Sequence, residues 1–334
     1  MTACIAISMG DPLGIGPEVT IKALTDGRVS ASFQVYGARA IYERTARQLG
    51  LTLPEQRIEW IEVGGGDRGE DLSGGAAGTL QVASLAAAVA AVRAGRADAL
   101  CTAPITKAAA RAAGFPFPGH TEYLAHSFGV SRYAMMLAGP ASWVPRGRGA
   151  AMLRVVPLTG HVPLREVASL LTPELVADRA CVTVEALAWD FGLTAPRVGV
   201  AGLNPHAGEL GMLGDEEQRV LAPGLALARE ALARRGLAAE LVGPLPADAI
   251  FVPPVEYDAV LCCYHDQALI PLKMCCRDAA VNVTLGLPAV RTSPAHGSAL
   301  DIAGRGVARP ESMIAALRLA AELASLRSVT AARR

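Results

Sequence analysis

The chain alternates short apolar runs with helical patterns over nearly its whole length, and this alternation limits the folds that it can adopt. Thr172 before Pro173 predicts the start of one helix, and Gly95 predicts the end of another. Strands that alternate with helices favour an α/β architecture built on a mostly parallel sheet. The expected helices are residues 80–94, 173–191, 216–235 and 310–326, and the expected strands are residues 4–8, 33–36, 58–63, 99–102, 133–137, 152–158, 198–203, 239–242, 259–264 and 281–284.

Composition narrows the possible partners and compartments. The 334 residues carry a formal net charge of zero, so neither nucleic acid nor an anionic membrane is indicated as a partner. The first residues, MTACIAISMGDP, lack a cationic stretch, and we expect no signal peptide and no membrane-spanning segment. Seven cysteines, with two vicinal pairs and no CxxC spacing, indicate reduced thiols in a cytoplasmic protein.

Three of the six histidines closely follow apolar strand candidates. His161 ends RVVPLTGH, His206 ends VGVAGLNPH and His265 ends AVLCCYH. Ligands of open α/β sheets bind beyond the carboxyl ends of the strands, and three neutral imidazoles suit a catalytic divalent metal. Taken singly, each histidine could equally be a surface or hydrogen-bonding residue. The metal site is therefore a hypothesis that requires the three side chains to converge.

The segment GDPLGIGPE, residues 10–18, follows the first expected strand. Its glycines allow tight turning, and Pro17 can open a helix whose free N–H groups favour an anion. Val19 stands where the GxGxxG fingerprint needs its third glycine, and the GK[ST] of a Walker loop is missing. The segment predicts either an anion site or a plain strand-to-helix turn.

The segment FPGHTEYLAHS, residues 117–127, places His120 and Thr121 at an expected helix start. A hydroxyl, an imidazole and helix-end amides together could hold a phosphate. The alternative is that Thr121 only caps the helix. We interpret His126 as a helix-surface residue without a role.

Further polar residues follow downstream at regular spacing. Lys273, Asn282 and Arg291 recur at nine-residue intervals through segments that resemble strands. Two cations and an amide suit a phosphorylated or carboxylated substrate, and solvated strand edges are the alternative explanation. The glycine-rich segment HGSALDIAGRGVARPES, residues 296–312, predicts an ordered turn region before the last helix.

Seven segments in this order carry a resemblance that covers almost the whole chain. They are GDPLGIGPE, GHTEYLA, GLNPHAGELG, GPLPAD, YHDQALIPLK, VNVTLGLPAVRTS and HGSALDIAGRG. Together they closely resemble the 4-hydroxythreonine-4-phosphate dehydrogenase family of vitamin B6 biosynthesis. The first and last segments are also similar to segments of isopropylmalate and isocitrate dehydrogenases, which bind NAD(P) without a Rossmann fingerprint.

From the residues alone, the chain could form two lobes that exchange segments or two consecutive domains. The resemblance chooses between these alternatives. It implies an isopropylmalate-dehydrogenase-like α/β fold, with two lobes around a central cleft and mostly parallel sheets. The expected lobes are residues 1–122 plus 289–334, and residues 123–288, of which the second carries the metal ligands and the dimer contacts. Family members are homodimers whose active sites draw on both subunits, and we expect a homodimer here.

The resemblance also implies roles for residues at the matching positions. Asp266 would orient a histidine. The implied ligands of one divalent metal, Zn, Mg or Co, are His161, His206 and His265. The implied substrate contacts are His120, Thr121, Lys273, Asn282 and Arg291. The residues expected near the nicotinamide nucleotide are Asn282, Leu285, His296 and Gly297.

The implied reaction is NAD(P)+-dependent oxidation of 4-phosphohydroxy-L-threonine, followed by decarboxylation to 3-amino-2-oxopropyl phosphate. A bound metal would lower the pKa of the substrate hydroxyl, and the nicotinamide would accept the hydride. The general base would be Lys273, or Asp248 acting through water. The residues do not choose between these two.

Three features depart from the family pattern: the loop at residues 139–149 is longer than usual, and two single positions leave the substrate open. Gly160 stands where a threonine commonly precedes the metal histidine, and Ala295 stands where an acidic residue is usual. The alternative substrates are threonate or erythronate 4-phosphate and cis-dihydrodiol dicarboxylates, although the retained GHTE favours a phosphorylated substrate. A non-redox metal-binding or acyltransferase protein on the same fold is the alternative from another class. The HGSALDIAGRG segment argues against it, because that segment indicates a nucleotide.

Overall fold

The computed structural model describes residues 2–64, 72, 75–142, 144 and 151–332, with side chains to residue 329. The chain folds into two compact units that exchange segments. Unit 1 contains Met1–Ser131, Val281–Val283 and Leu287–Ser325. Unit 2 contains Arg132–Ala280, Thr284–Gly286 and Leu326–Arg334. Strand β10 therefore contributes residues to both units.

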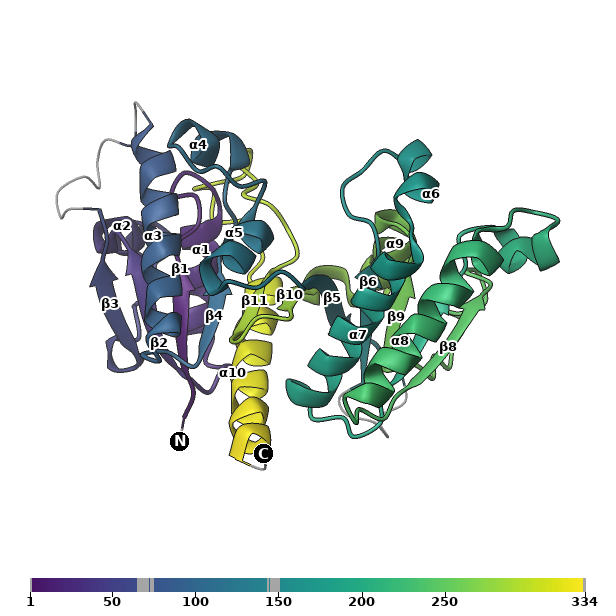
Figure 1. The fold of residues 1–334 in the computed structure, drawn as a ribbon. Helices are drawn as coiled ribbons and strands as arrows, with labels where there is room; N and C mark the ends of the chain where they lie inside the picture. The colour runs from purple at the N-terminus through teal and green to yellow at the C-terminus, as the bar shows by residue number, and fades with distance from the viewer. Residues whose placement is uncertain (1, 65–71, 73–74, 143, 145–150, 333–334) are drawn as a thin grey trace. The chain divides into compact units, whose positions relative to one another are not determined.

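Unit 1 is a sheet with helices packed on it (Figure 1). Its strands lie in the order β3-β2-β1-β4-β11-β10, and only the β10–β11 pair is antiparallel. The strands are β1 (Cys4–Ser8), β2 (Ser32–Gly37), β3 (Ile58–Glu62), β4 (Ala99–Thr102), β10 (Val281–Leu285) and β11 (Val290–Pro294). The helices are α1 (Gly16–Thr25), α2 (Arg39–Leu49), α3 (Ala76–Arg93), α4 (Lys107–Ala112), α5 (His120–Phe128) and α10 (Glu311–Ala332).

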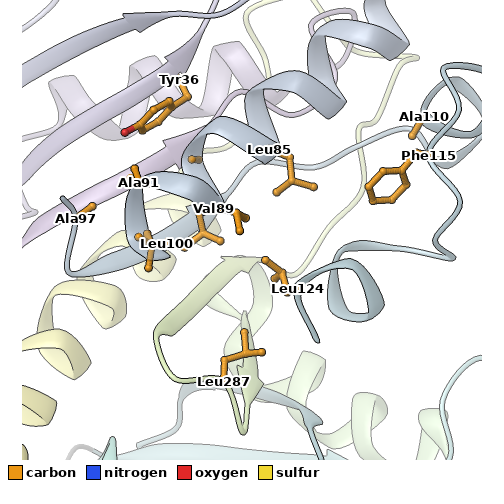
Figure 2. Close-up of a cluster of buried hydrophobic side chains, with 13 residues drawn as sticks. Tyr36, Leu85, Val89, Ala91, Ala97, Leu100, Ala110, Phe115, Leu124 and Leu287 are labelled. Atoms are coloured by element: carbon orange, nitrogen blue, oxygen red, sulfur yellow. The ribbon is translucent and has the colours of Figure 1, made fainter. Parts of the chain in front are cut away.

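Helix α3 forms the centre of one core cluster in unit 1. It packs against β1, β2 and β4, and its alanines allow a close approach to the strands. Figure 2 shows Leu85 and Val89 of this helix beside Leu100, Phe115 and Leu124. By length and composition alone α3 could span a membrane, but 56% of the stretch is buried within the protein. Its apolar character is thus explained by its place in the core.

Unit 2 contains the other strands of the sheet, in the order β5-β6-β9-β7-β8. The β5–β6 pair is antiparallel, and the other pairs are parallel. The strands are β5 (Ala134–Pro140), β6 (Met152–Pro157), β7 (Arg197–Ala201), β8 (Glu240–Leu245) and β9 (Ala259–Cys262). The helices are α6 (Val167–Leu170), α7 (Pro173–Trp189), α8 (Ala222–Arg234) and α9 (His265–Cys276).

Helices α7 and α8 pack closely on each other in unit 2 (Figure 1). Gly224 makes the close approach possible, because a Cβ there would lie 2.6 Å from Cβ of Val176. The buried face of α8 contains Leu225, Ala228 and Leu232, at the helical spacing i, i+3 and i+7. Leu227 lies on the other side of the same helix and is 42% exposed.

The structure confirms the mostly parallel α/β architecture and the existence of every expected strand. Thr172 caps α7 by accepting a hydrogen bond from the backbone N–H of Leu175, and Gly95 follows α3 in the left-handed conformation, as predicted. All seven cysteines are free thiols. Strand β11 was not among the expected strands, although Arg291 was placed in a strand-like segment, because its sequence VRTSP is polar and only its surroundings bury it.

Two interpretations of local structure were wrong, and a third concerns segments that lie largely outside the described residues. Lys273 lies in helix α9 and not in a strand-like segment. Thr121 does not cap α5, since the N-cap residue is Gly119 and no side chain caps the helix. Glycine and proline in the sequence predict loops at residues 64–78 and 139–149. Both segments lie largely outside the described residues, although the first ends in α3 and the second begins in β5.

The buried face of α8 generates a stability prediction. Leu225→Ala should lower the free energy of unfolding by about 2–5 kcal/mol, because it removes a fully buried side chain and leaves a cavity. The matched control Leu227→Ala, on the exposed side of the same helix, should change it by less than about 1 kcal/mol. Urea unfolding followed by circular dichroism measures both. Equal losses would show that α8 does not bury the face described.

Candidate active site

The three histidines singled out from the sequence all lie in unit 2, beyond the carboxyl ends of adjacent strands. His161 follows β6, His206 follows β7, and His265 is the first residue of α9, just after β9. Strands β6, β9 and β7 are neighbours and run parallel, so their carboxyl ends lie at one edge of the sheet. This edge is where ligands of open α/β sheets bind.

The fold brings two of these imidazoles together. The ring centroids of His161 and His265 lie 5.0 Å apart. Nδ1 of His265 lies 2.6 Å from Oδ1 of Asp266, at hydrogen-bonding distance. A carboxylate that fixes one ring nitrogen leaves the other available, which is the usual arrangement around metal-bound histidines. The pair and its carboxylate thus fit a divalent metal in donor chemistry.

The third imidazole does not complete the group within one chain. His206 is 67% exposed, and its Nδ1 lies 3.6 Å from Oε2 of Glu209. Among the residues that the structure describes, no three histidine, cysteine, aspartate or glutamate side chains lie together as a metal site. The three-histidine ligand set therefore stays a prediction. Within one folded chain, the rings of His161 and His265 are neighbours, and His206 does not join them.

A set of hydrogen bonds, here called the junction, connects the three strand ends. Oγ1 of Thr159 donates to the carbonyl of Cys263 over 2.8 Å, which joins the segment after β6 to the end of β9. The N–H of Cys263 donates to Oε1 of Gln267 over 2.6 Å. Nε2 of Gln267 donates to the carbonyl of Gly202 over 2.8 Å, which reaches the end of β7. The segments that carry the three histidines are thus fixed to one another.

A second group of candidate residues lies in unit 1 around a buried cation. Arg291, in β11, is only 2% exposed, so it is not a solvated strand edge. Its Nη2 donates to Oγ1 of Thr102 over 2.6 Å. Burial lowers the pKa of Arg291 to about 10, while Cys101 and Glu122 act in the opposite direction. A guanidinium can donate two parallel hydrogen bonds to a carboxylate or a phosphate, so this region suits a negatively charged ligand.

His120 and Asn282 add hydrogen-bonding groups to this region. Nε2 of His120, at the start of α5, and Oδ1 of Asn282, in β10, are buried and have no hydrogen-bond partner among the described residues. Burial, followed by the positive charges of Arg291 and Lys107, lowers the pKa of His120 well below 6.5. A neutral His120 beside two cations can donate to, or accept from, an incoming polar group. Thr121, next to it, is half-buried.

The segments GDPLGIGPE and HGSALDIAGRG, far apart in the chain, lie against each other in unit 1. The N–H of Ile15 donates to the carbonyl of Ser298 over 2.9 Å. Gly14 permits this contact, because a Cβ there would lie 2.7 Å from the same carbonyl oxygen. Lys22 donates to the carbonyls of Gly306 and Ala308, at 2.9 and 2.7 Å. These hydrogen bonds between α1 and the glycine-rich segment fix the shape of that segment. The sequence did not predict this contact.

The remaining predicted site residues have different surroundings. Lys273, in the last turn of α9, and Asp248, in the turn after β8, are exposed. Leu285, in β10, has a fully buried side chain. Nε2 of His296 is buried and has no hydrogen-bond partner among the described residues, and Gly297 beside it is exposed. Their roles near substrate or nucleotide stay predictions.

Comparison with known proteins gives a consistent family. The model of the family described as "Pyridoxal phosphate biosynthetic protein PdxA" matches residues 28–320. A relative from Synechocystis sp., named 4-hydroxythreonine-4-phosphate dehydrogenase, is 42% identical and covers 97% of this chain and 96% of its own length. The crystal structure of a 4-hydroxythreonine-4-phosphate dehydrogenase from Klebsiella pneumoniae covers 97% of this chain and 98% of its own, with a TM-score of 0.81 and 35% identity.

More distant structures mark the limits of the similarity. A terephthalate 1,2-cis-dihydrodiol dehydrogenase from Burkholderia xenovorans has a TM-score of 0.65 and 30% identity, over 96% of this chain and 98% of its own. A β-decarboxylating dehydrogenase from Thermococcus kodakarensis has a TM-score of 0.54 and 17% identity, over 99% of this chain and 87% of its own. The latter similarity concerns the fold alone.

The surroundings of His120 generate a pH prediction. Because its pKa lies below the ordinary value, the folded protein should keep His120 neutral at pH 6.5, where this residue of an unfolded chain is about half protonated. The stability that depends on this difference should therefore fall as the pH drops below about 6.5. Arg291→Gln should raise the pKa of His120, because it removes a nearby positive charge. NMR titration of the His120 ring protons measures the shift.

The control for this titration is Arg111→Gln, which removes an exposed cation from α4 that does not act on His120. It should leave the titration of His120 unchanged. A wild-type His120 that protonates near pH 6.5 would contradict the assignment of a buried imidazole beside two cations.

Proposed function

Since this chain belongs to the family of the pyridoxal phosphate biosynthetic protein PdxA, we propose that it oxidises 4-phosphohydroxy-L-threonine with a nicotinamide cofactor. The oxidation yields a β-keto acid, which loses carbon dioxide to give 3-amino-2-oxopropyl phosphate. The observation that carries the proposal is the near full-length similarity, at 42% identity, to a relative named for this dehydrogenase activity. The chain is thus an enzyme of pyridoxal phosphate biosynthesis.

The anionic substrate suits the polar group in unit 1. Arg291 is a buried cation, and His120 and Asn282 each present a buried atom that lacks a partner among the described residues. A phosphate or carboxylate would accept hydrogen bonds from Arg291 and from Nε2 of His120, and Oδ1 of Asn282 would accept from a hydroxyl or amino group of the substrate. We assign the binding of these anionic groups to Arg291, His120, Thr121 and Asn282, and assign Lys273 to the same substrate.

The metal-binding part of the proposal rests on the histidines of unit 2. His161, His206 and His265 would hold one divalent cation, Zn²⁺, Mg²⁺ or Co²⁺. Bound there, the cation would supply a Lewis acid that lowers the pKa of the substrate hydroxyl. Asp266 would keep the ring of His265 in one orientation through the contact of 2.6 Å.

Hydride and proton leave the substrate by separate routes. NAD+ or NADP+ would accept the hydride, and HGSALDIAGRG, shaped by α1, would lie against this cofactor near His296 and Gly297. The hydroxyl proton needs a base, and Lys273 or Asp248 would take it. Both side chains are exposed and therefore accessible from solvent.

A homodimer would complete the site. The described residues of one chain bring only two of the three histidines together. Large apolar side chains are exposed on the elements of unit 2 that surround the histidines: Leu164, Leu170, Leu210, Met212, Leu213, Ile270 and Met274. Exposed apolar surface of this kind marks an interaction site. A second copy of the chain would cover it and could supply the missing imidazole.

The test of this function compares substrates on the purified protein. We expect reduced nicotinamide to form with 4-phosphohydroxy-L-threonine, together with released carbon dioxide, and kcat/KM to be lower for threonate 4-phosphate, erythronate 4-phosphate and a cis-dihydrodiol dicarboxylate. A chelator should abolish the reaction, and Zn²⁺, Co²⁺ or Mg²⁺ should restore it. A preference for another acid would reassign the substrate. No reduction with any of them, metal replete, would favour a non-redox protein on this fold.

Two histidine variants separate the metal site from general damage. His206→Ala should lower kcat by at least about 100-fold, because losing a metal ligand costs no less than losing a residue that orients one. His126→Ala, at an exposed position of α5, should leave kcat unchanged. Steady-state kinetics and thermal unfolding of both variants measure this. Full activity in a folded His206→Ala variant would remove His206 from the site.

The exposed apolar surface generates a prediction about assembly. Ile270 and Met274 lie one turn apart on α9 and are 61% and 78% exposed. The double variant Ile270→Asp, Met274→Asp should convert a dimer to a monomer, since it places two carboxylates in an apolar interface. Leu300→Asp, at a 53% exposed position of unit 1, is the control and should stay dimeric. Sedimentation velocity distinguishes these states. An active wild-type monomer would exclude the shared site.

A further inference from the structure

The loop that carries His206 has an unusual backbone. Residues 206–211 all have positive φ, with values of 52, 52, 79, 43, 57 and 96°. We call the segment Pro205–Gly211 the histidine turn. Only two of these six residues are glycines, and the left-handed conformation is sterically unfavourable for residues that have a Cβ. Such a run persists only where the surrounding structure holds it.

One buried carboxyl group holds the base of this turn. Glu217 is 3% exposed and begins a π-helical turn, Glu217–Leu221, immediately before α8. Its Oε1 accepts hydrogen bonds from the backbone N–H groups of Leu203 and Asn204, both at 2.8 Å. Its Oε2 accepts from Nδ2 of Asn204 at 3.0 Å. All these partners are donors, which suits a carboxylate that only accepts.

The same carboxyl group also fills the inside of the turn. A Cβ at Gly208 would lie 2.7 Å from Oε2 of Glu217, so this glycine makes room for the carboxyl group. A Cβ at Gly202 would lie 3.2 Å from Oε1. Nδ2 of Asn204 additionally donates to Oε2 of Glu216 at 2.7 Å, so Asn204 links both carboxyl groups. Glu217 thus contacts the chain on both sides of His206.

We propose that Glu217 is a positioning residue for His206, which it holds in the left-handed turn through Leu203, Asn204 and Gly208. Glu217 does not contact the imidazole in any described interaction, so it acts through the backbone. The inference rests on the proposed function, in which His206 binds the metal. Without Glu217, the donors at the base of the turn lose their acceptor inside a buried region, and the strained conformation gives way to others.

The experiment measures Co²⁺ binding by the metal-depleted full-length protein, from the visible d–d absorption of the bound ion. Glu217→Ala should weaken Co²⁺ binding by about 10- to 100-fold and change the intensity of the d–d bands. Glu217→Gln should give a smaller loss, since its amide oxygen can still accept from Leu203 and Asn204. Hydrogen exchange at the amides of Leu203 and Asn204 should accelerate in Glu217→Ala. The KM for the nicotinamide cofactor should not change.

Glu230→Gln provides the matched control. Glu230 lies on α8 at a largely exposed position and pairs with Arg234 over 3.6 Å. This variant should bind Co²⁺ as the wild type does. If Glu217→Ala does not fold, Glu217→Gln and Asn204→Ala test the positioning role of Glu217. Each removes the hydrogen bond from Nδ2 of Asn204 to Oε2 of Glu217 and should weaken Co²⁺ binding. A folded Glu217→Ala variant with wild-type Co²⁺ affinity and d–d bands would overturn the proposal.

A reference variant separates this inference from the proposed function. His206→Ala should lose Co²⁺ affinity whether or not Glu217 positions the turn. If His206→Ala binds Co²⁺ like the wild type, the metal assignment of His206 fails, and the proposal for Glu217 fails with it. If His206→Ala loses affinity and the Glu217 variants do not, only the positioning role is wrong.

Discussion

The junction between Thr159, Cys263, Gln267 and Gly202 is the constraint on which the candidate metal site depends. Parallel strands leave their carboxyl ends at one edge, but the segments beyond those ends have no ladder to hold them. In unit 2 the hydrogen bonds of the junction connect the segments that follow β6, β7 and β9, and these segments carry the histidines. The adjacent rings of His161 and His265 follow from this arrangement.

Unit 1 presents a different feature, a buried cation. Arg291 lies under the surface with Thr102 as a hydroxyl partner, and His120 nearby is kept neutral by burial and by two cations. A buried guanidinium beside a neutral imidazole offers hydrogen-bond donors that suit a phosphate or a carboxylate. In the proposed function, unit 2 would supply imidazoles for a metal, and unit 1 would supply donors for an anion. Metal binding and anion binding in the proposed reaction therefore depend on residues of different units.

The sequence predicted most of the fold because its signals were local. Apolar runs, helix caps and glycines at helix ends depend on near neighbours, so strands such as β1 and the caps at Thr172 and Gly95 could be predicted. Strand β11 could not, since VRTSP has no apolar periodicity and only the surrounding chain buries it. Lys273 was predicted to lie in a strand-like segment because Pro271, close to it, is unfavourable inside a helix. Helix α9 forms nevertheless, since it is stabilised by packing on β5, β6 and β9.

By itself the sequence determined the order of strands and helices, the family, and the residue types available for chemistry. Tertiary structure decided how those residues are presented: Arg291 is buried, His161 and His265 are adjacent, and His206 lies on a left-handed turn apart from them. It also introduced Glu217 and Gln267, which no local pattern marks. The physical reason is that their hydrogen bonds join residues distant in sequence, and such contacts exist only after the chain has folded.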